Sequence, residues 1–387
     1  MFSVSRFGEL FQAFPKSVFQ QEVNKVKADR KRSQCRSWDV LLLSVFGQLS
    51  QSRSLRACVD TFNAQQRHHY HLGTREMKRS TVSDALSRQD TAAFKRVCNE
   101  LIAQSSRSER ASCRELLYLL DSTCIKTPKP AYDWSATYTT RRGRGLKLHL
   151  GLIADSTALH YANITPMTVN DITDAKAGMP LEPGAFYAVD KGYCDYCWWS
   201  QIDAVGAYFV TRLKRNAAVK EIESRSVLGK DIVSDSTIQL TNKYPGGHRR
   251  NPYAHRDLRR IEVKLYDTEE TITLVTNEMS RSAEELALMY KKRWQIETLF
   301  RWLKQKLKLK TFLGCSENAV RLQIYCALIA YLLVRLLHRY SDGQWTLSVF
   351  TRRLQATLFE RVEKYPHYYR KRLEKDAYIQ SVQPKLL

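Results

Sequence analysis

The chain has 387 residues, in which 62 Lys and Arg outnumber 39 Asp and Glu and leave a formal net charge of +23. Apolar residues make up 43% of the chain, so it is a globular protein with room for two or three domains, and a disordered chain and a small secreted scaffold are both excluded. So basic a balance predicts a polyanionic partner.

The N-terminal stretch is interrupted by Arg6, Glu9 and Lys16, so it lacks the unbroken apolar core of a signal peptide. The longest charge-free apolar run, Ile324–Val334, is shorter than the ~20 residues of a membrane span and predicts a buried helix. Nine cysteines at irregular spacing are typical of reduced thiols. We therefore expect a cytoplasmic protein without a membrane partner. Metal binding by His68, His69 and His71 or by the Cys194–Cys197 pair is a lesser alternative.

Residues 1–105 are predicted to form helices. Apolar residues recur at helical spacing between Val40 and Leu49, and Ser80 and Thr81 form an N-cap signal before the next apolar stretch. The first hundred residues carry 17 Lys and Arg against 9 Asp and Glu. This composition predicts a helical, basic DNA-binding domain at 1–105, although a helical domain that is merely basic and solvated stays open.

Apolar runs of strand length begin at residue 115. Three strands (116–120, 146–154 and 158–164) precede a short helix around 170–178, a strand at 185–189, a helix at 193–204 and a fifth strand at 207–211. This βββαβαβ order predicts an α/β fold with a sheet of mixed direction. A basic, turn-rich insertion follows, with strands at 260–267 and 271–276, and helices are expected at 283–310, 318–340 and 344–364.

Two aspartates stand where predicted buried strands emerge. Asp121 follows four apolar residues in LLYLLDST, and Asp190 follows another such run in AFYAVDKGY. Open α/β sheets bind ligands at the carboxyl ends of their strands, and two carboxylates on neighbouring strands can share a divalent metal ion. Each aspartate taken alone could equally be a turn or N-cap residue.

A third carboxylate, Glu297, lies in a predicted helix with a polar stripe. At about 100° per residue, one stripe of this helix gathers Tyr290, Arg293, Glu297 and Lys304. The adjoining stripe, which we expect to be buried, consists of Met289, Ile296, Phe300, Leu303 and Leu307. A surface ion pair between Glu297 and its neighbouring cations is the simpler alternative.

The spacing of Tyr290, Arg293, Glu297 and Lys304 resembles the Y(2)R(3)E(6)K signature of the insertion-sequence-4 family of bacterial DDE transposases, transposase family 11. The blocks LLDST, KLHLGL, AVDKGY and YFVTRLK resemble other family blocks in the same order, and residues 1–75 resemble its N-terminal helical domain. The resemblance implies an α/β, ribonuclease-H-like catalytic core with a β-strand insertion. It implies the segments 1–105 (helical), 106–212 (first part of the core), 213–280 (insertion), 281–317 (catalytic Glu helix) and 318–387 (C-terminal helices and basic tail).

Carried over by position, the resemblance implies that Asp121, Asp190 and Glu297 are a catalytic triad holding two Mg²⁺ ions, with Mn²⁺ as an expected substitute. It implies that Tyr290, Arg293 and Lys304 bind DNA phosphates. Arg301 and Lys308 extend the cationic stripe, and they are either further phosphate contacts or solvated charges. The family's base-stacking insertion tryptophan is missing, because no Trp lies within 212–280. Tyr244, Tyr253 or Tyr266 could supply the stacking face, or the hairpin step could differ in this chain; of the three, Tyr253 is the residue that we expect to contact DNA near the cleavage site.

The resemblance implies a cut-and-paste DNA transposase that binds terminal inverted repeats, cleaves with Mg²⁺, forms a hairpin and transfers strands into target DNA. It also implies a homodimer on double-stranded DNA. Helices within 318–364 could form the dimer contact, or 324–334 could be internal core. A ribonuclease-H-like nuclease without strand transfer and a cleavage-inactive DNA-binding relic are the alternatives.

Overall fold

The computed structural model describes residues 5–30, 34–127, 130–141, 143–227, 229–244, 250–265, 270–307, 312–339 and 345–362. The chain divides into two compact units. Residues 1–101 and 302–387 form the helical unit, and residues 102–301 form the sheet unit.

The helical unit is built around one long apolar helix, α12 (Glu317–Arg339). Residues 324–334 are all buried, and α12 packs against α1, α3, α6 and α13. By length and composition α12 could cross a membrane, but 89% of its apolar window is buried inside the structure. The prediction of a buried helix is confirmed. The other helices are α1 (Arg6–Leu10), η1 (Phe11–Ala13), α2 (Lys16–Lys25), α3 (Ser37–Leu49), α4 (Leu55–Asn63), α5 (Gln66–Leu72), α6 (Arg79–Arg88), α7 (Ala92–Ser112), which runs on into the sheet unit, and α13 (Leu347–Ala356).

The first and last described segments of the chain meet inside the helical unit. The backbone N–H of Phe7 donates to the carbonyl of Leu358 at 2.7 Å, and that of Arg6 donates to Glu360 at 3.1 Å. The segments 1–105 and 318–387, which the resemblance treats separately, therefore share one compact unit as far as they are described. Their functional division, like that of 106–212, 213–280 and 281–317, stays a prediction.

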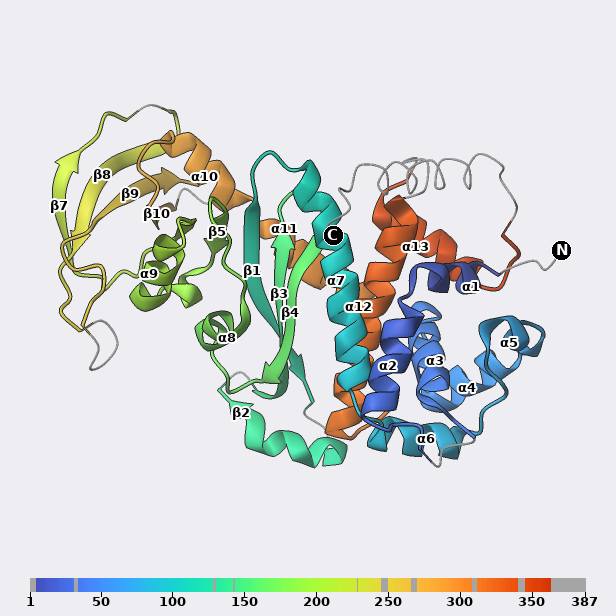
Figure 1. Cartoon of the computed structure of the whole chain (residues 1–387). Helices are drawn as coiled ribbons and strands as arrows, with labels where there is room; N and C mark the ends of the chain where they lie inside the picture. Colours follow the sequence, from blue (N-terminus) through green and yellow to red (C-terminus); the bar gives the residue numbers. More distant parts are fainter. Residues whose placement is uncertain are drawn as a thin grey trace, which may run out of the picture. The chain divides into compact units, whose positions relative to one another are not determined.

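Ten strands of the sheet unit form one sheet among the described residues, in the order β2-β3-β1-β5-β6-β10-β9-β8-β7, with β4 paired to β3 (Figure 1). Strand β1 pairs antiparallel with β3 and parallel with β5, which is parallel to β6. The bounds are β1 (Leu117–Lys126), β2 (Thr139–Thr140), β3 (Gly143–Ile153), β4 (Ala158–Pro166), β5 (Phe186–Val189), β6 (Tyr208–Arg212), β7 (Val219–Ser224), β8 (Ile232–Leu240), β9 (Asp257–Lys264) and β10 (Thr271–Thr276). The mixed α/β fold class is confirmed.

The insertion continues the core sheet. Strand β10 pairs antiparallel with β6, and β9, β8 and β7 follow outward (Figure 1). One face of the sheet packs on α8 (Asp171–Gly178) and α9 (Tyr196–Ala204), whose Ala175, Trp198 and Trp199 share a core with Tyr187 and Phe209. The short helices η2 (Pro130–Tyr138) and η3 (Lys191–Tyr193) complete this part of the chain, and α10 (Ala283–Lys291) contacts β5, β6 and β8.

The helix expected at 283–310 is two helices. Helix α10 ends at Lys291 and α11 starts at Trp294, because a turn at Lys292 and Arg293 interrupts them. The expected apolar stripe is nevertheless buried across the break, at Met289, Ile296, Phe300, Leu303 and Leu307. The prediction that Tyr290, Arg293, Glu297 and Lys304 share one stripe of a single helix is wrong in one respect. Tyr290 belongs to α10, Arg293 to the turn, and Glu297 and Lys304 to α11.

Gly145 allows β3 to lie close to β1, the strand that carries Asp121. It has a φ of +140°, and a Cβ there would lie 2.2 Å from the carbonyl oxygen of Ile125. Gly184 also has positive φ, at +74°, but no heavy atom lies within 4 Å of its Cβ position. Substitution of Gly184 would therefore introduce backbone strain alone, whereas substitution of Gly145 would add a steric clash to it.

Gly184→Ala should lower the free energy of unfolding by about 1 kcal/mol, the cost of left-handed backbone for a residue with a Cβ. Gly145→Ala should cost at least about 2 kcal/mol more, because the methyl group must push the two strands apart. Urea unfolding of both variants measures the difference. Equal losses would show that β3 tolerates a side chain at this position.

Candidate active site

The register of β1 and β5 sets Asp121 beside Asp190. The parallel pairing ends with Leu120 opposite Val189, so the next residue on each strand is the aspartate. Side chains alternate along a strand, and both aspartates therefore lie on the sheet face opposite Leu120 and Val189, which belong to the α8–α9 core. Adjacent strands are about 4.8 Å apart, so the two carboxylates are neighbours.

The two aspartates differ in their backbone. Asp190 directly follows the last residue of β5, as predicted, and is the N-cap of η3. Asp121 does not end its strand, because β1 continues for five more residues, to Lys126, paired with β3 alone. The sheet therefore opens beside Asp121 on the β5 side only.

The third carboxylate, Glu297, is brought to the sheet by the turn between β3 and β4. Asp155 in that turn accepts hydrogen bonds from Lys292 Nζ at 2.6 Å and from Gln295 Nε2 at 2.7 Å. The backbone N–H of Asp155 donates to Gln295 Oε1 at 2.8 Å. These contacts hold the start of α11 two residues before Glu297. They lower the pKa of Asp155, mainly through the hydrogen bonds from Lys292 and Gln295.

Arg293 connects two of the three carboxylates. Its Nη2 donates to Glu297 Oε1 at 2.8 Å, and its Nη1 lies 3.8 Å from Asp121 Oδ2. The Arg293 side chain is 10% exposed, so this charge is largely shielded from water. The candidate triad therefore contains its own counter-charge.

The pKa of Asp121 is raised to about 6. Burial is the largest cause, and the negative charges of Glu297 and Asp190 raise it further. The backbone N–H of Ser122, which donates to Asp121 Oδ1 at 2.8 Å, and the charge of Arg293 act in the opposite direction. Asp121 thus interacts electrostatically with both other acids.

Three carboxylates offer the oxygen donors that Mg²⁺ prefers. Within the described residues, no three His, Cys, Asp or Glu side chains are arranged to hold an ion together, and this includes His68, His69 and His71. In the candidate triad, one oxygen of Glu297 is bound to Arg293 instead. The donor set fits a divalent cation chemically, since the hydrogen bond from Arg293 occupies only one of the two oxygens of Glu297.

Three side-chain atoms beside the triad lack hydrogen-bond partners within the described part of the chain: the Tyr290 hydroxyl oxygen, Nε of Arg212 and Nε of Arg293. The Tyr290 ring lies near both arginines, since the guanidinium groups of Arg212 and Arg293 are 6.0 Å and 5.9 Å from its centroid. Burial raises the pKa of Tyr290. Arg212 is the last residue of β6 and lies in the block YFVTRLK. Its place at the end of a predicted strand was the signal that could have identified it as a candidate site residue.

The remaining predicted phosphate contacts lie further along α11 (Trp294–Lys306). Arg301 is exposed, and Lys304 is half-buried in the last turn. They follow Glu297 by four and seven residues, so the helix carries all three on one side. Lys308 lies outside the described residues. The phosphate-binding role of this row stays a prediction.

Tyr253 is not available as a stacking face. It is 1% exposed, its ring packs edge-on against Trp199 and Phe209, and its hydroxyl donates to the carbonyl of Trp199 at 3.2 Å. The position does not agree with the prediction that Tyr253 stacks on a DNA base, because the side chain is almost fully buried. From the sequence alone, a buried tyrosine in a basic loop cannot be distinguished from an exposed one, because its burial depends on tertiary packing.

Trp294 is an exposed aromatic side chain beside the triad that the sequence did not bring to attention. It is 59% exposed, and the Arg293 guanidinium lies 5.6 Å from its ring centroid. It stands three residues before Glu297, on the same side of α11. Its position inside the Y(2)R(3)E(6)K spacing, directly after the arginine, was the available signal.

Asp121 should destabilise the metal-free fold at neutral pH. Its pKa is about 6 in the folded protein against an ordinary value of 3.8, so ionisation costs folding free energy that is fully present above pH 6 and absent below pH 4. Asp121→Asn should therefore raise the free energy of unfolding at pH 7.5 by about 1–3 kcal/mol and lose this advantage near pH 4. Thermal unfolding with EDTA at both pH values measures it. A variant no more stable than wild type at pH 7.5 would contradict the raised pKa.

Comparisons with known proteins agree with this geometry. Residues 112–333 match the family model "Transposase DDE domain", and residues 4–75 match a domain of unknown function, DUF4372. A Sinorhizobium fredii protein named as a transposase, y4zB, is 39% identical over 285 residues, covering 72% of this chain and 77% of that protein. A Geobacillus stearothermophilus protein named as a transposase for insertion sequence element IS5377 is 28% identical, covering 70% of each chain. With its mixed sheet, its gathered carboxylates and this match over more than half its length, the chain belongs to the DDE transposase family.

Proposed function

We propose that this DDE transposase is a cut-and-paste enzyme that binds the terminal inverted repeats of its element, cleaves them with Mg²⁺ and transfers the ends into target DNA. The observation that carries the proposal is the meeting of Asp121, Asp190 and Glu297, from two strands and a helix, around the shielded cation Arg293. The named transposase relatives support it. We place this activity in the cytoplasm, on the nucleoid.

The candidate triad would hold two divalent ions, for which Mn²⁺ can substitute. Such ions stabilise the attacking and leaving oxygens of a phosphoryl transfer. The scissile phosphate gains negative charge in the transition state, so fixed cations beside it lower the barrier. Arg212 and Arg293 are suited to this, and the unpartnered Tyr290 hydroxyl is free to donate to a phosphate oxygen.

Wider DNA binding follows from the distribution of charge. Residues 241–264 carry seven Lys and Arg against two acids, residues 281–310 carry nine against three, and the first hundred residues are basic as well. We propose that these segments bind the phosphates of the transposon ends, with Arg301, Lys304 and Lys308 beside the scissile bond. Two ends must be joined at one target, so we propose a homodimer in the synaptic complex and a hairpin intermediate.

A nuclease without strand transfer would use the same acids. It differs in the product, because a transposase joins the freed 3′ ends to target DNA. Labelled ends that are cut but never joined to a target would favour the nuclease.

Trp294 deepens the proposal by supplying an aromatic face beside the cleavage site. Exposed aromatic rings stack on unpaired bases and contribute about 1–3 kcal/mol per base. The ring lies next to Arg293 and on the Glu297 side of α11, so a base displaced near the scissile phosphate would be within its reach. We propose Trp294, in place of Tyr253, as the base-stacking residue.

Asp121→Asn, Asp190→Asn and Glu297→Gln should each reduce Mg²⁺-dependent nicking of terminal repeats by at least about 10³-fold, because each removes a metal ligand. Binding of the ends, measured by gel shift without metal, should stay within about threefold of wild type. Normal nicking by any one of the three variants would refute the assignment of the triad.

Trp294→Ala should slow cleavage or hairpin formation by about tenfold or more, through loss of stacking on a displaced base. Leu288→Ala is the matched control, since Leu288 is an exposed apolar residue of α10 (57% exposed against 59%). Fluorescence of 2-aminopurine placed at the transposon end reports base displacement directly. Equal effects of the two substitutions would assign Trp294 a general surface role only.

A further inference from the structure

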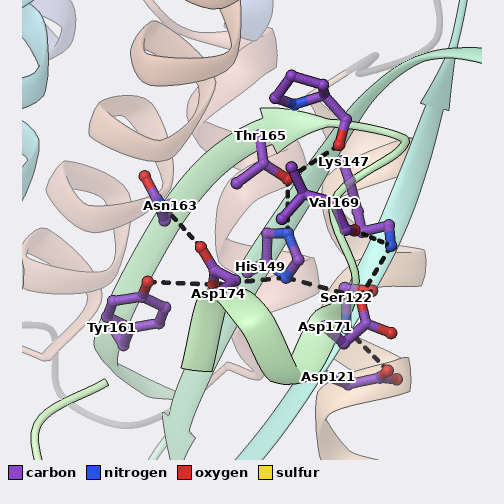
Figure 2. A network of polar contacts seen from close by, with 11 residues as sticks. Asp121, Ser122, Lys147, His149, Tyr161, Asn163, Thr165, Val169, Asp171 and Asp174 are labelled. Carbon is purple, nitrogen blue, oxygen red and sulfur yellow. Dashed lines mark hydrogen bonds and ion pairs between the residues drawn. The ribbon is translucent and has the colours of Figure 1, made fainter. Parts of the chain in front are cut away.

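A polar network lies behind Asp121, on the opposite face of β1. Ser122 follows Asp121 directly, so strand alternation turns its side chain toward α8. Its hydroxyl donates to Asp171 Oδ1 at 2.7 Å, and Asp171 is the first residue of α8 (Figure 2). The backbone N–H of the same Ser122 donates to Asp121 Oδ1 at 2.8 Å. Ser122 therefore joins Asp171 on one face to Asp121 on the other.

Asp171 also lies close to the segment that follows Asp190. A Cβ at Gly192, two residues beyond Asp190, would lie 3.9 Å from Asp171 Oδ2. Helix α8 packs against η3, which contains Gly192. One carboxylate group thus lies against the residues that follow both aspartates of the candidate triad.

The charge of Asp171 is balanced by Lys147. Its Nζ lies 3.1 Å from Asp171 Oδ1 and donates to the carbonyl of Val169 at 2.7 Å, and the Lys147 side chain is 11% exposed (Figure 2). Breaking a shielded pair by removing one partner is costly, because the other charge stays buried. Asp171 is therefore held in place from the sheet.

Asp174, one turn later on α8, makes a comparable set of contacts away from the triad. Its Oδ1 accepts from Asn163 Nδ2 at 2.6 Å, and its Oδ2 accepts from the Tyr161 hydroxyl at 3.0 Å (Figure 2). Both partners belong to β4. Asp174 attaches α8 to the sheet, whereas Asp171 contacts the ends of the catalytic strands.

We propose that Asp171 is a positioning residue for metal binding: through Ser122 and the Gly192 turn, it holds Asp121 and Asp190 in the relative position that lets them share a divalent ion. It contacts neither ion nor DNA. Residues that orient metal ligands typically contribute 10–100-fold to metal affinity or activity. The inference rests on the proposed function of the triad and adds a residue that the signature motif does not contain.

The test compares Asp171→Ala with the matched control Asp174→Ala, another buried acid of the same helix. Asp171→Ala should raise the Mn²⁺ concentration for half-maximal nicking by about tenfold or more. Asp174→Ala should lower the thermal unfolding temperature but leave that concentration unchanged. Asp171→Asn keeps an oxygen acceptor for Ser122, so it should recover much of the lost affinity. Mn²⁺ binding measured by electron paramagnetic resonance without DNA gives a readout independent of catalysis.

Ser122→Ala provides a second test that is less prone to misfolding, because it removes a single hydroxyl group. It should shift the Mn²⁺ requirement in the same direction, and the double variant Ser122→Ala/Asp171→Ala should be no worse than Asp171→Ala alone. Equal Mn²⁺ requirements for Asp171→Ala and Asp174→Ala, or additive effects in the double variant, would overturn the inference. In that case the wild type would still nick and depend on its triad, whereas failure of the proposed function would show as nicking that survives the triad substitutions.

Discussion

The electrostatic repulsion among three carboxylates is the constraint on which this site depends. Burial, together with the negative charges of Glu297 and Asp190, raises the pKa of Asp121 and so the cost of its ionisation. In this structure Arg293 offsets that cost by bonding Glu297 and approaching Asp121. A divalent ion would take over the same task. The site therefore contains an internal cation, Arg293, beside the carboxylates that would hold an external one.

The fold supports the site from three sides. The β1–β5 register sets the two aspartates side by side, and the Asp155 turn holds the start of the Glu297 helix. On the far face, Asp171 joins Ser122 to α8. These contacts come from segments far apart in the chain, since Glu297 follows Asp190 by 107 residues. The insertion fills much of that gap with strands that extend the core sheet, so it lengthens the chain without breaking the scaffold.

Prediction from sequence worked where one local pattern dominates. Seven of the ten strands were read from apolar runs, whereas β2, β7 and β8 were not predicted. The buried stripe from Met289 to Leu307 was read from helical spacing, because burial of apolar surface imposes both patterns. Prediction was less successful where the same local sequence pattern is compatible with two different structures. The turn at Lys292 and Arg293 keeps the apolar stripe buried, so no gap in the hydrophobic pattern marks it. Tyr253 has the composition of a DNA-binding loop around it, yet its ring fills the core beside Trp199.

By itself, the sequence determined the fold class and the segment that forms the central helix of the helical unit, because hydrophobic periodicity is written in consecutive residues. The motif spacing predicted the three acids of the candidate triad. Only the tertiary structure decided which partners each acid has. Three contacts join residues that share no local sequence pattern: Arg293 with Asp121, Asp155 with Gln295 of α11, and Asp171 with Ser122. Such contacts depend on strand register and helix packing, which arise from the burial of the whole core.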